Sequence, residues 1–283
     1  FTAEPDHRSV QVAFWYPQAK LENELFPLII FSHGGLGTIT SNESLYLELA
    51  SHGYVVCSIG HPYHALWTKD DKGSLTWANK DYFRELQEED PEKNLAQSYS
   101  YYQKWMKIRT DDINFVLDNF LDKADTRLEE IYARIDVDRI GMIGHSLGGS
   151  AALAMSRLRD DIDVVIALES PFLYDIVGVE NNEFIWLEEE YPVPVMNIYS
   201  DSSWENLTNW PQYAQNVTML SVSKDNVSNL YLAGAGHFSL TDLSLASPVF
   251  TRILEGDKSS VESRIYLINV NNEVLKFLNR YLK

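Results

Sequence analysis

The sequence predicts an α/β domain in which a mostly parallel central sheet is covered by helices on both faces. Short apolar, β-branched segments alternate with longer segments of helical periodicity, and most of the strand-like segments are followed by glycine or a polar turn. A chain of 283 residues with 45% hydrophobic composition is also long enough to bury a substantial core. Because no repeat, low-complexity tract or linker interrupts it, we expect residues 1–283 to form a single domain.

The expected elements follow one another in a simple order. Strands are predicted at 10–16, 28–32, 54–59, 140–144, 164–168, 195–199 and 229–233. Apolar residues at helical spacing predict helices at 44–51, 95–120, 146–158 and 261–282. Aromatic and polar insertions are expected near 62–91, 172–194 and 201–225. Since each insertion follows a strand, and ligands of such sheets bind beyond the carboxyl ends of the strands, the insertions are placed to shape a binding site.

The strongest chemical signal is Gly-His-Ser-Leu-Gly at 144–148, which follows an apolar strand and precedes a run of small residues. This pattern is typical of a nucleophile elbow, a strained strand-to-helix turn that raises a serine hydroxyl above the sheet edge. Its glycines leave room for the neighbouring backbone. We predict Ser146 as the nucleophile and the amide of Leu147, at the start of the next helix, as one oxyanion donor.

A second oxyanion donor is expected in the loop that follows the early strand at 28–32. That strand ends in His33-Gly34-Gly35, a pattern typical of esterases in which glycines let the backbone approach the substrate closely. The amide of Gly35 or Leu36 is the candidate donor. Gly35 is favoured because it directly follows His33-Gly34.

A serine hydroxyl needs a base, and the base needs an orienting acid. His237 follows a strand-like segment and the turn Gly-Ala-Gly at 234–236, and it lies downstream of the serine as the order Ser, acid, His requires. Two carboxylates, Glu169 and Asp201, end predicted strands between Ser146 and His237. Spacing alone favours neither of them.

Other residues that commonly carry chemistry are assigned structural roles. His61 and His64 resemble a metal-binding pair, but no carboxylate or third histidine stands at metal-ligand spacing, so pocket lining or structural hydrogen bonding is expected and no metal is predicted. The only cysteine, Cys57, excludes an internal disulfide and is expected to be an inert core residue.

The formal net charge of −18 argues against nucleic acid as a main partner, because nucleic acid requires clustered Lys and Arg. No apolar run approaches the roughly 20 residues of a membrane-spanning helix. A small, neutral or weakly charged substrate is therefore expected. The chain begins at Phe1, which is compatible with a cytoplasmic protein or with an exported one whose leader has been removed, and nothing in the sequence sets an oligomeric state.

Several motifs together resemble the platelet-activating factor acetylhydrolases and their bacterial, dienelactone-hydrolase-like relatives, which have the α/β-hydrolase fold. They lie at 12–17, 31–37, 49–56, 60–63, 138–141 and 144–149. In that family the triad acid lies in a Leu-Asp segment, which matches Leu168-Glu169 with Glu in place of Asp, and the oxyanion loop tends to be one residue shorter. The resemblance implies hydrolysis of short or oxidised acyl chains from phospholipid-like or other small esters, without calcium or an organic cofactor.

Two other hypotheses are kept beside the esterase. One is an amidase or peptidase of the same fold, because a triad does not distinguish esters from amides. The other is a non-catalytic binding protein that retains the fold. The tryptophans of the insertions either line an apolar pocket or pack within the insertions themselves; they are Trp67, Trp77, Trp186, Trp204 and Trp210.

Overall fold

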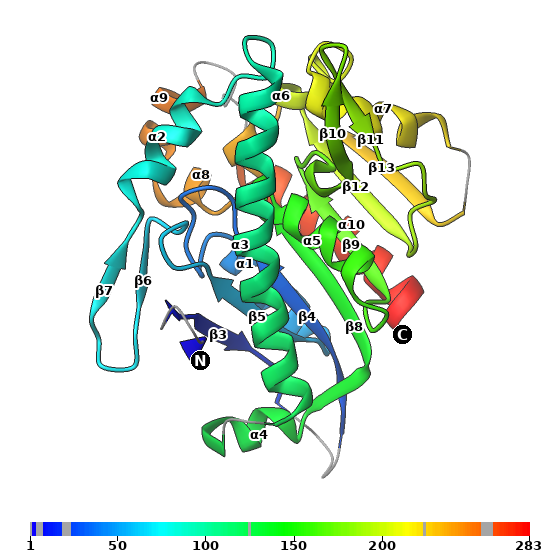
Figure 1. Cartoon of the computed structure of the whole chain (residues 1–283). Coiled ribbons are helices and arrows are strands. Elements are labelled where there is room, and N and C mark those ends of the chain that lie inside the picture. Colours follow the sequence, from blue (N-terminus) through cyan, green and yellow to red (C-terminus); the bar gives the residue numbers. More distant parts are fainter. Residues whose placement is uncertain (1, 4–7, 19–23, 124–125, 223–224, 256–262) are drawn as a thin grey trace.

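The computed structural model describes residues 2–3, 8–18, 24–123, 126–222, 225–255 and 263–283. Its centre is a seven-stranded sheet with the order β13-β12-β9-β8-β4-β5-β3 (Figure 1). The strands are β3 (Gln11–Trp15), β4 (Phe26–Ser32), β5 (Val55–Gly60), β8 (Ile135–His145), β9 (Val164–Leu168), β12 (Val195–Ser200) and β13 (Val227–Leu232). All neighbours pair in parallel except β3, which pairs antiparallel with β5. The predicted strands are confirmed. β8 begins earlier than expected because its first residues pair with the start of β4.

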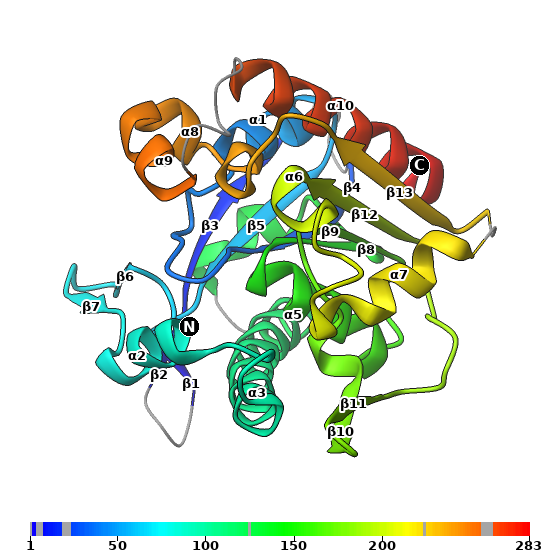
Figure 2. The same ribbon diagram turned by 90° about the horizontal axis from the view of Figure 1, so that it is seen from above.

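Helices cover both faces of this sheet, as predicted. The helices α3 (Leu95–Leu121) and α5 (Leu147–Leu158) lie on one face, and α1 (Glu43–Ser51) and α10 (Ser263–Leu282) lie on the other (Figure 2). Alternate residues of β4 pack into two hydrophobic cores, one on each face of the sheet. Leu28 and Ile30 pack into the core that contains α3 and α5, while Ile29 and Phe31 pack into the core that contains α1 and α10. A strand buried on both faces explains its uninterrupted apolar sequence.

The remaining elements are short and lie largely in the predicted insertions. Segment 62–91 contains β6 (Trp67–Lys69), β7 (Leu75–Trp77) and α2 (Lys80–Glu88). Segment 172–194 contains β10 (Ile176–Glu180) and β11 (Glu183–Trp186), and segment 201–225 contains α6 (Asp201–Trp204) and α7 (Ala214–Ser221). The others are β1 (Thr2–Ala3), β2 (Arg8–Ser9), α4 (Glu129–Tyr132), α8 (Leu243–Ala246) and α9 (Pro248–Glu255). The predicted start of the last helix, at 261–262, lies outside the described residues.

The parallel direction of five strands brings the candidate site residues to one edge of the sheet. His33 follows β4, Ser146 follows β8, Glu169 follows β9, Asp201 follows β12 and His237 comes shortly after β13. The short helices α2, α6, α8 and α9 surround this edge, in the upper part of Figure 1. Within the described ranges, no helix is long and apolar enough to cross a membrane.

Candidate active site

The turn between β8 and α5 holds Ser146 in an unusual backbone conformation. Its φ is 52° and its ψ is −126°, a region that L-residues rarely adopt and that costs about 1–3 kcal/mol. The Ser146 amide donates to the Leu168 carbonyl at 2.8 Å, which fixes the turn to the end of β9. Surrounding contacts therefore impose the strained geometry that the elbow sequence predicts.

Glycines allow the elbow to pack against its neighbours. A Cβ on Gly144 would lie 2.3 Å from the Gly148 backbone, and one on Gly148 would lie 2.0 Å from the Ser32 carbonyl oxygen. Both contacts are far shorter than van der Waals distances, so neither position accommodates another residue without a backbone shift. The start of α5 consequently lies directly against the end of β4.

Ser146 opens into a cavity of about 430 Å³ at the carboxyl edge of the sheet. Gly35 from the loop after β4 and His237 from the segment after β13 line the same cavity. The apolar part of its wall is Leu36, Leu66, Leu86, Phe238, Leu243 and Ala246. Leu66 and Leu86 belong to the insertion at 62–91, whereas none of the tryptophans considered above is among the lining residues of the described chain. The apolar part of the wall is therefore mostly aliphatic, and the tryptophans do not form it.

His237 is held beside Ser146 through its backbone. Its amide donates to the Ser202 hydroxyl at 3.1 Å, and its carbonyl accepts from His145 Nε2 at 3.1 Å. Burial lowers the pKa of His237 to about 4, so the imidazole is neutral near pH 7 and able to accept a proton. Within the described residues no hydrogen bond joins the His237 ring to Ser146, which is common in sites without a bound substrate.

The two candidate acids differ in how their carboxylates are used. Glu169 is only 2% exposed and its Oε2 accepts from the Ser200 amide, while Oε1 is buried and has no hydrogen-bond partner among the described residues. Burial raises the pKa of Glu169. Asp201, by contrast, accepts from the Tyr231 hydroxyl at 2.6 Å and from the Gly234 amide at 3.1 Å. Neither carboxylate bonds to His237 in the described chain, and Glu169 is the one of the two with a buried oxygen that lacks a hydrogen bond there.

The alternatives for the second oxyanion donor also differ. The Leu36 amide donates to the His64 carbonyl at 3.2 Å, whereas the Gly35 amide has no acceptor among the described residues. The amide of Leu147, the first residue of α5, has none in this part of the chain either. The two predicted donors, Gly35 and Leu147, are thus the available amides, although Leu147 is not among the residues that line the cavity.

The histidine pair of the sequence has a structural role here. His61 is fully buried, and its two ring nitrogens lie 2.9 Å from Ser32 Oγ and 3.1 Å from Asp112 Oδ2. His64 stacks on Tyr82 with 3.9 Å between ring centroids. No group of three or more His, Cys, Asp or Glu side chains able to hold a metal ion occurs among the residues that the structure describes.

Sequence reasoning missed the residues behind the oxyanion loop. Arg109, on α3, donates both Nη atoms to the carbonyls of His33 and Gly34, and Arg8 joins Asp112 at 2.9 Å. The sequence did carry one signal for them: Arg109 is a charged residue on the apolar face of the predicted helix, and a buried charge requires hydrogen-bonding or charged partners.

Comparison with known proteins identifies similar chains. Residues 13–283 match the sequence model of the family described as platelet-activating factor acetylhydrolase, isoform II. The platelet-activating factor acetylhydrolase of Canis lupus familiaris is 26% identical over 282 residues, which cover 92% of this chain and 58% of the dog protein. The chain thus spans little more than half the length of that relative.

Two solved structures share the fold. A ferulic acid esterase from Streptomyces cinnamoneus superposes with a TM-score of 0.62 and 20% identity, covering 93% of this chain and 68% of the esterase. A dienelactone hydrolase from Anabaena variabilis gives a TM-score of 0.54 and 13% identity, covering 97% of this chain and 93% of the hydrolase. These likenesses show that the chain has the α/β-hydrolase fold.

Proposed function

The chain belongs to the platelet-activating factor acetylhydrolase isoform II family, and we propose that it is a serine ester hydrolase that removes short acyl groups from phospholipid-like or other small esters. One observation carries this proposal. Ser146 and His237, which follow two different strands, line one cavity together with Gly35, whose amide has no acceptor in the described chain. A nucleophile, a neutral base and a hydrogen-bond donor facing one space are the requirements of acyl transfer.

In the first half of the reaction, Ser146 Oγ attacks the ester carbonyl carbon while His237 takes the hydroxyl proton. The carbonyl oxygen becomes an oxyanion that accepts from the amides of Gly35 and Leu147. When the tetrahedral intermediate collapses, the bond to the alkoxy oxygen breaks and the protonated His237 gives its proton to the departing alcohol. An acyl group remains on Ser146.

Water completes the cycle on the same groups. His237 takes a proton from a water molecule while the water oxygen attacks the acyl carbon. The resulting tetrahedral intermediate then collapses, the bond to Ser146 Oγ breaks, and the protonated His237 returns a proton to that oxygen. The carboxylic acid product leaves and the free serine is restored. No cofactor enters either half of the reaction.

We assign the orienting acid to Glu169. Oε1, buried and without a hydrogen bond among the described residues, supports this role, because an imidazolium forming on His237 would give that oxygen a charged partner. Asp201 instead secures the turn at Gly234, shortly before His237.

The cavity supports the proposed substrate class. Aliphatic side chains and Phe238 form the apolar part of its wall, and Asp242, whose carboxylate accepts from Ser44, is the acidic residue among the lining residues of the described chain; both properties disfavour substrates with a negative charge near the ester. The net charge of −18 acts in the same direction at longer range. Esters of neutral or zwitterionic alcohols fit these properties.

An acyl series tests the proposal. We expect initial rates on matched esters from acetyl to palmitoyl to be highest at short chains, unchanged by EDTA, and far above the rates on the matching amides. Ser146→Ala should remove hydrolysis, while Ser150→Ala should retain it, because Ser150 lies one turn along α5 and its hydroxyl donates to the Pro171 carbonyl. Hydrolysis by the Ser146→Ala protein would refute the nucleophile, and a maximum at long chains would refute the substrate class.

A further inference from the structure

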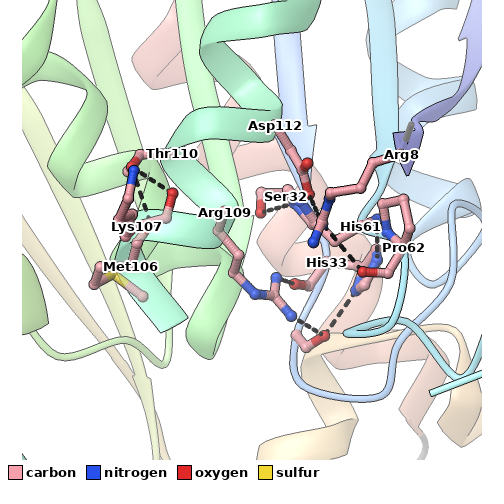
Figure 3. A network of polar contacts seen from close by, with 11 residues as sticks. Arg8, Ser32, His33, His61, Pro62, Met106, Lys107, Arg109, Thr110 and Asp112 are labelled. Carbon is pink, nitrogen blue, oxygen red and sulfur yellow. Dashed lines mark hydrogen bonds and ion pairs between the residues drawn. The ribbon is translucent and has the colours of Figure 1, made fainter. Parts of the chain in front are cut away.

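Behind the oxyanion loop, away from the cavity, lies a buried polar network that the reaction steps above do not use. Figure 3 shows Arg109 extending from α3 to the backbone after β4, with Arg8, Ser32, His61 and Asp112 beside it. Arg109 is fully buried. Its Nη1 donates to the His33 carbonyl and its Nη2 to the Gly34 carbonyl, the latter at 3.1 Å.

The charge of Arg109 is held by backbone rather than by an acid. Within the described ranges no carboxylate lies at ion-pair distance from its guanidinium, and Asp112, one turn along α3, is engaged by Arg8 and His61. Burying a cation without a carboxylate at ion-pair distance is costly, and its hydrogen bonds to the two loop carbonyls offset that cost together with the nearby Tyr82 hydroxyl and the more distant charge of Asp112. A neutral residue at this position would avoid the cost if the only requirement were to fill space.

The bond to Gly34 sets the direction of the next amide. The Gly34 carbonyl and the Gly35 N–H belong to one planar trans peptide and therefore point in opposite directions. His33 Nδ1 and the Gly37 amide reach the same carbonyl oxygen at 2.7 and 3.1 Å. With that oxygen fixed on the buried side, the Gly35 N–H is turned away from Arg109, and Gly35 lines the cavity beside Ser146.

A second chain of contacts fixes the strand end from which the loop starts. Ser32 Oγ lies 2.9 Å from His61 Nε2, His61 Nδ1 lies 3.1 Å from Asp112 Oδ2, and Arg8 joins the same carboxylate oxygen. This order of groups resembles a catalytic triad, but Ser32 is fully buried and has no access to a substrate. It anchors the last residue of β4, and the Gly34 carbonyl of the following loop is then held by Arg109 together with His33 Nδ1 and the Gly37 amide.

We propose that Arg109 is a positioning residue of the oxyanion hole: it fixes the Gly34–Gly35 peptide so that the Gly35 amide points at the oxyanion. The cation on the carbonyl side also polarises that peptide and makes its N–H a stronger donor. The inference rests on the proposed function. It predicts that Arg109 acts on the transition state, in which the oxyanion exists, and leaves binding of the uncharged ester unchanged.

Steady-state kinetics of Arg109→Lys and Arg109→Met test this inference. Arg109→Lys keeps the positive charge but loses the two paired N–H donors, and Arg109→Met removes the charge and the donors. We expect kcat to fall by about 10-fold in the lysine variant and by about 100-fold or more in the methionine variant, with KM nearly unchanged, since loss of one oxyanion donor costs that much in other serine hydrolases. Thr110→Val, the neighbouring buried position, whose hydroxyl bonds within α3, is the matched control and should keep wild-type kcat.

A transition-state analogue separates positioning from general damage. An alkyl boronic acid, which forms a tetrahedral adduct on the serine, should lose affinity by the same factor as kcat, while a competitive amide analogue of the ester keeps its affinity. Folded Arg109 variants, judged by thermal melting, that keep wild-type kcat would overturn the inference. So would a loss of kcat without loss of boronate affinity. Failure of the proposed function itself has a different signature, because Ser146→Ala would then remain active.

Discussion

The assignment of the acid depends on which carboxylate has a free, buried oxygen. We expect Glu169→Gln to lower kcat by about 1,000-fold or more, because the imidazolium of His237 loses its negative partner. Asp201→Asn should cost far less in kcat and should mainly lower stability, by about 1–3 kcal/mol, because its bonds to Tyr231 and Gly234 are structural. Parallel kinetics and urea unfolding of the two variants check this, and the reverse ranking in kcat would move the role to Asp201.

The state of His237 sets the acid side of the pH profile. A general base works only when neutral, so activity is lost as pH falls through the pKa of the folded enzyme. Since burial lowers the pKa of His237 to about 4, we expect kcat/KM to stay high at pH 6 and to fall with an inflection near pH 4. Rates measured from pH 8 down to the lowest pH at which the protein stays folded test this. An inflection at or above pH 6.5 would show that His237 is not desolvated in the free enzyme.

At the scale of elements, the elbow depends on contacts that only glycine permits. Gly148→Ala should destabilise the protein by about 3 kcal/mol or more, because its Cβ would meet the Ser32 carbonyl oxygen at 2.0 Å and the backbone would have to move. Gly178→Ala, in β10, is the matched control, since its nearest neighbour would be a side-chain atom of Ile185 at 3.3 Å. Urea unfolding of both variants is the measurement. Equal stabilities would mean that α5 is not packed tightly on β4.

Periodicity predicted the elements of the sheet and its covering helices because their apolar patterns are long and uninterrupted. The elbow and the His-Gly-Gly loop were also predictable, since their glycines answer local backbone requirements. The β6–β7 and β10–β11 hairpins were not predicted. Their strands are short and partly exposed, so their sequences carry little alternation of apolar and polar residues.

Contacts between segments that are distant in the sequence could not be predicted from the sequence. The sequence around Arg109 does not show that its partners are carbonyls more than 70 residues away. The contacts of His61 with Ser32 and Asp112 also join segments that are far apart in the sequence. The choice between Gly35 and Leu36 likewise needed the loop geometry, in which the Leu36 amide is already bonded to the His64 carbonyl.

At the scale of the whole molecule, buried histidines link stability to pH. His33, His61, His64 and His145 are at most 3% exposed, and burial is the main reason that the pKa of each is lowered. Unfolding lets each bind a proton below pH 6.5, so stability is present above that value and is lost as pH falls. Each contributes about 1.4 kcal/mol per pH unit in this range. Carboxyl groups whose pKa is raised by burial oppose the histidines, because they bind protons more readily in the folded protein; they are Asp112, raised to about 6, and Glu89, Asp163, Glu169, Asp175 and Asp242.

We therefore expect the free energy of unfolding to fall steeply between pH 6.5 and 5. His64→Phe should flatten that slope by about 1.4 kcal/mol per pH unit, because it removes one titrating group while allowing the stacking on Tyr82 to persist. Urea titrations of both proteins at several pH values provide the slopes. Stability that does not change, or that rises, over this range would contradict the prediction.

The central claim is that Ser146 is the nucleophile, and the site of covalent labelling tests it most directly. Ser146 lines the cavity that His237 also lines, whereas Ser32, which lies beside His61, is fully buried. Mass spectrometry after treatment with a fluorophosphonate should find one adduct per chain, on the peptide that carries Ser146, and Ser32→Ala should still be labelled while Ser146→Ala is not. An adduct on another residue, or undiminished labelling of Ser146→Ala, would contradict the account.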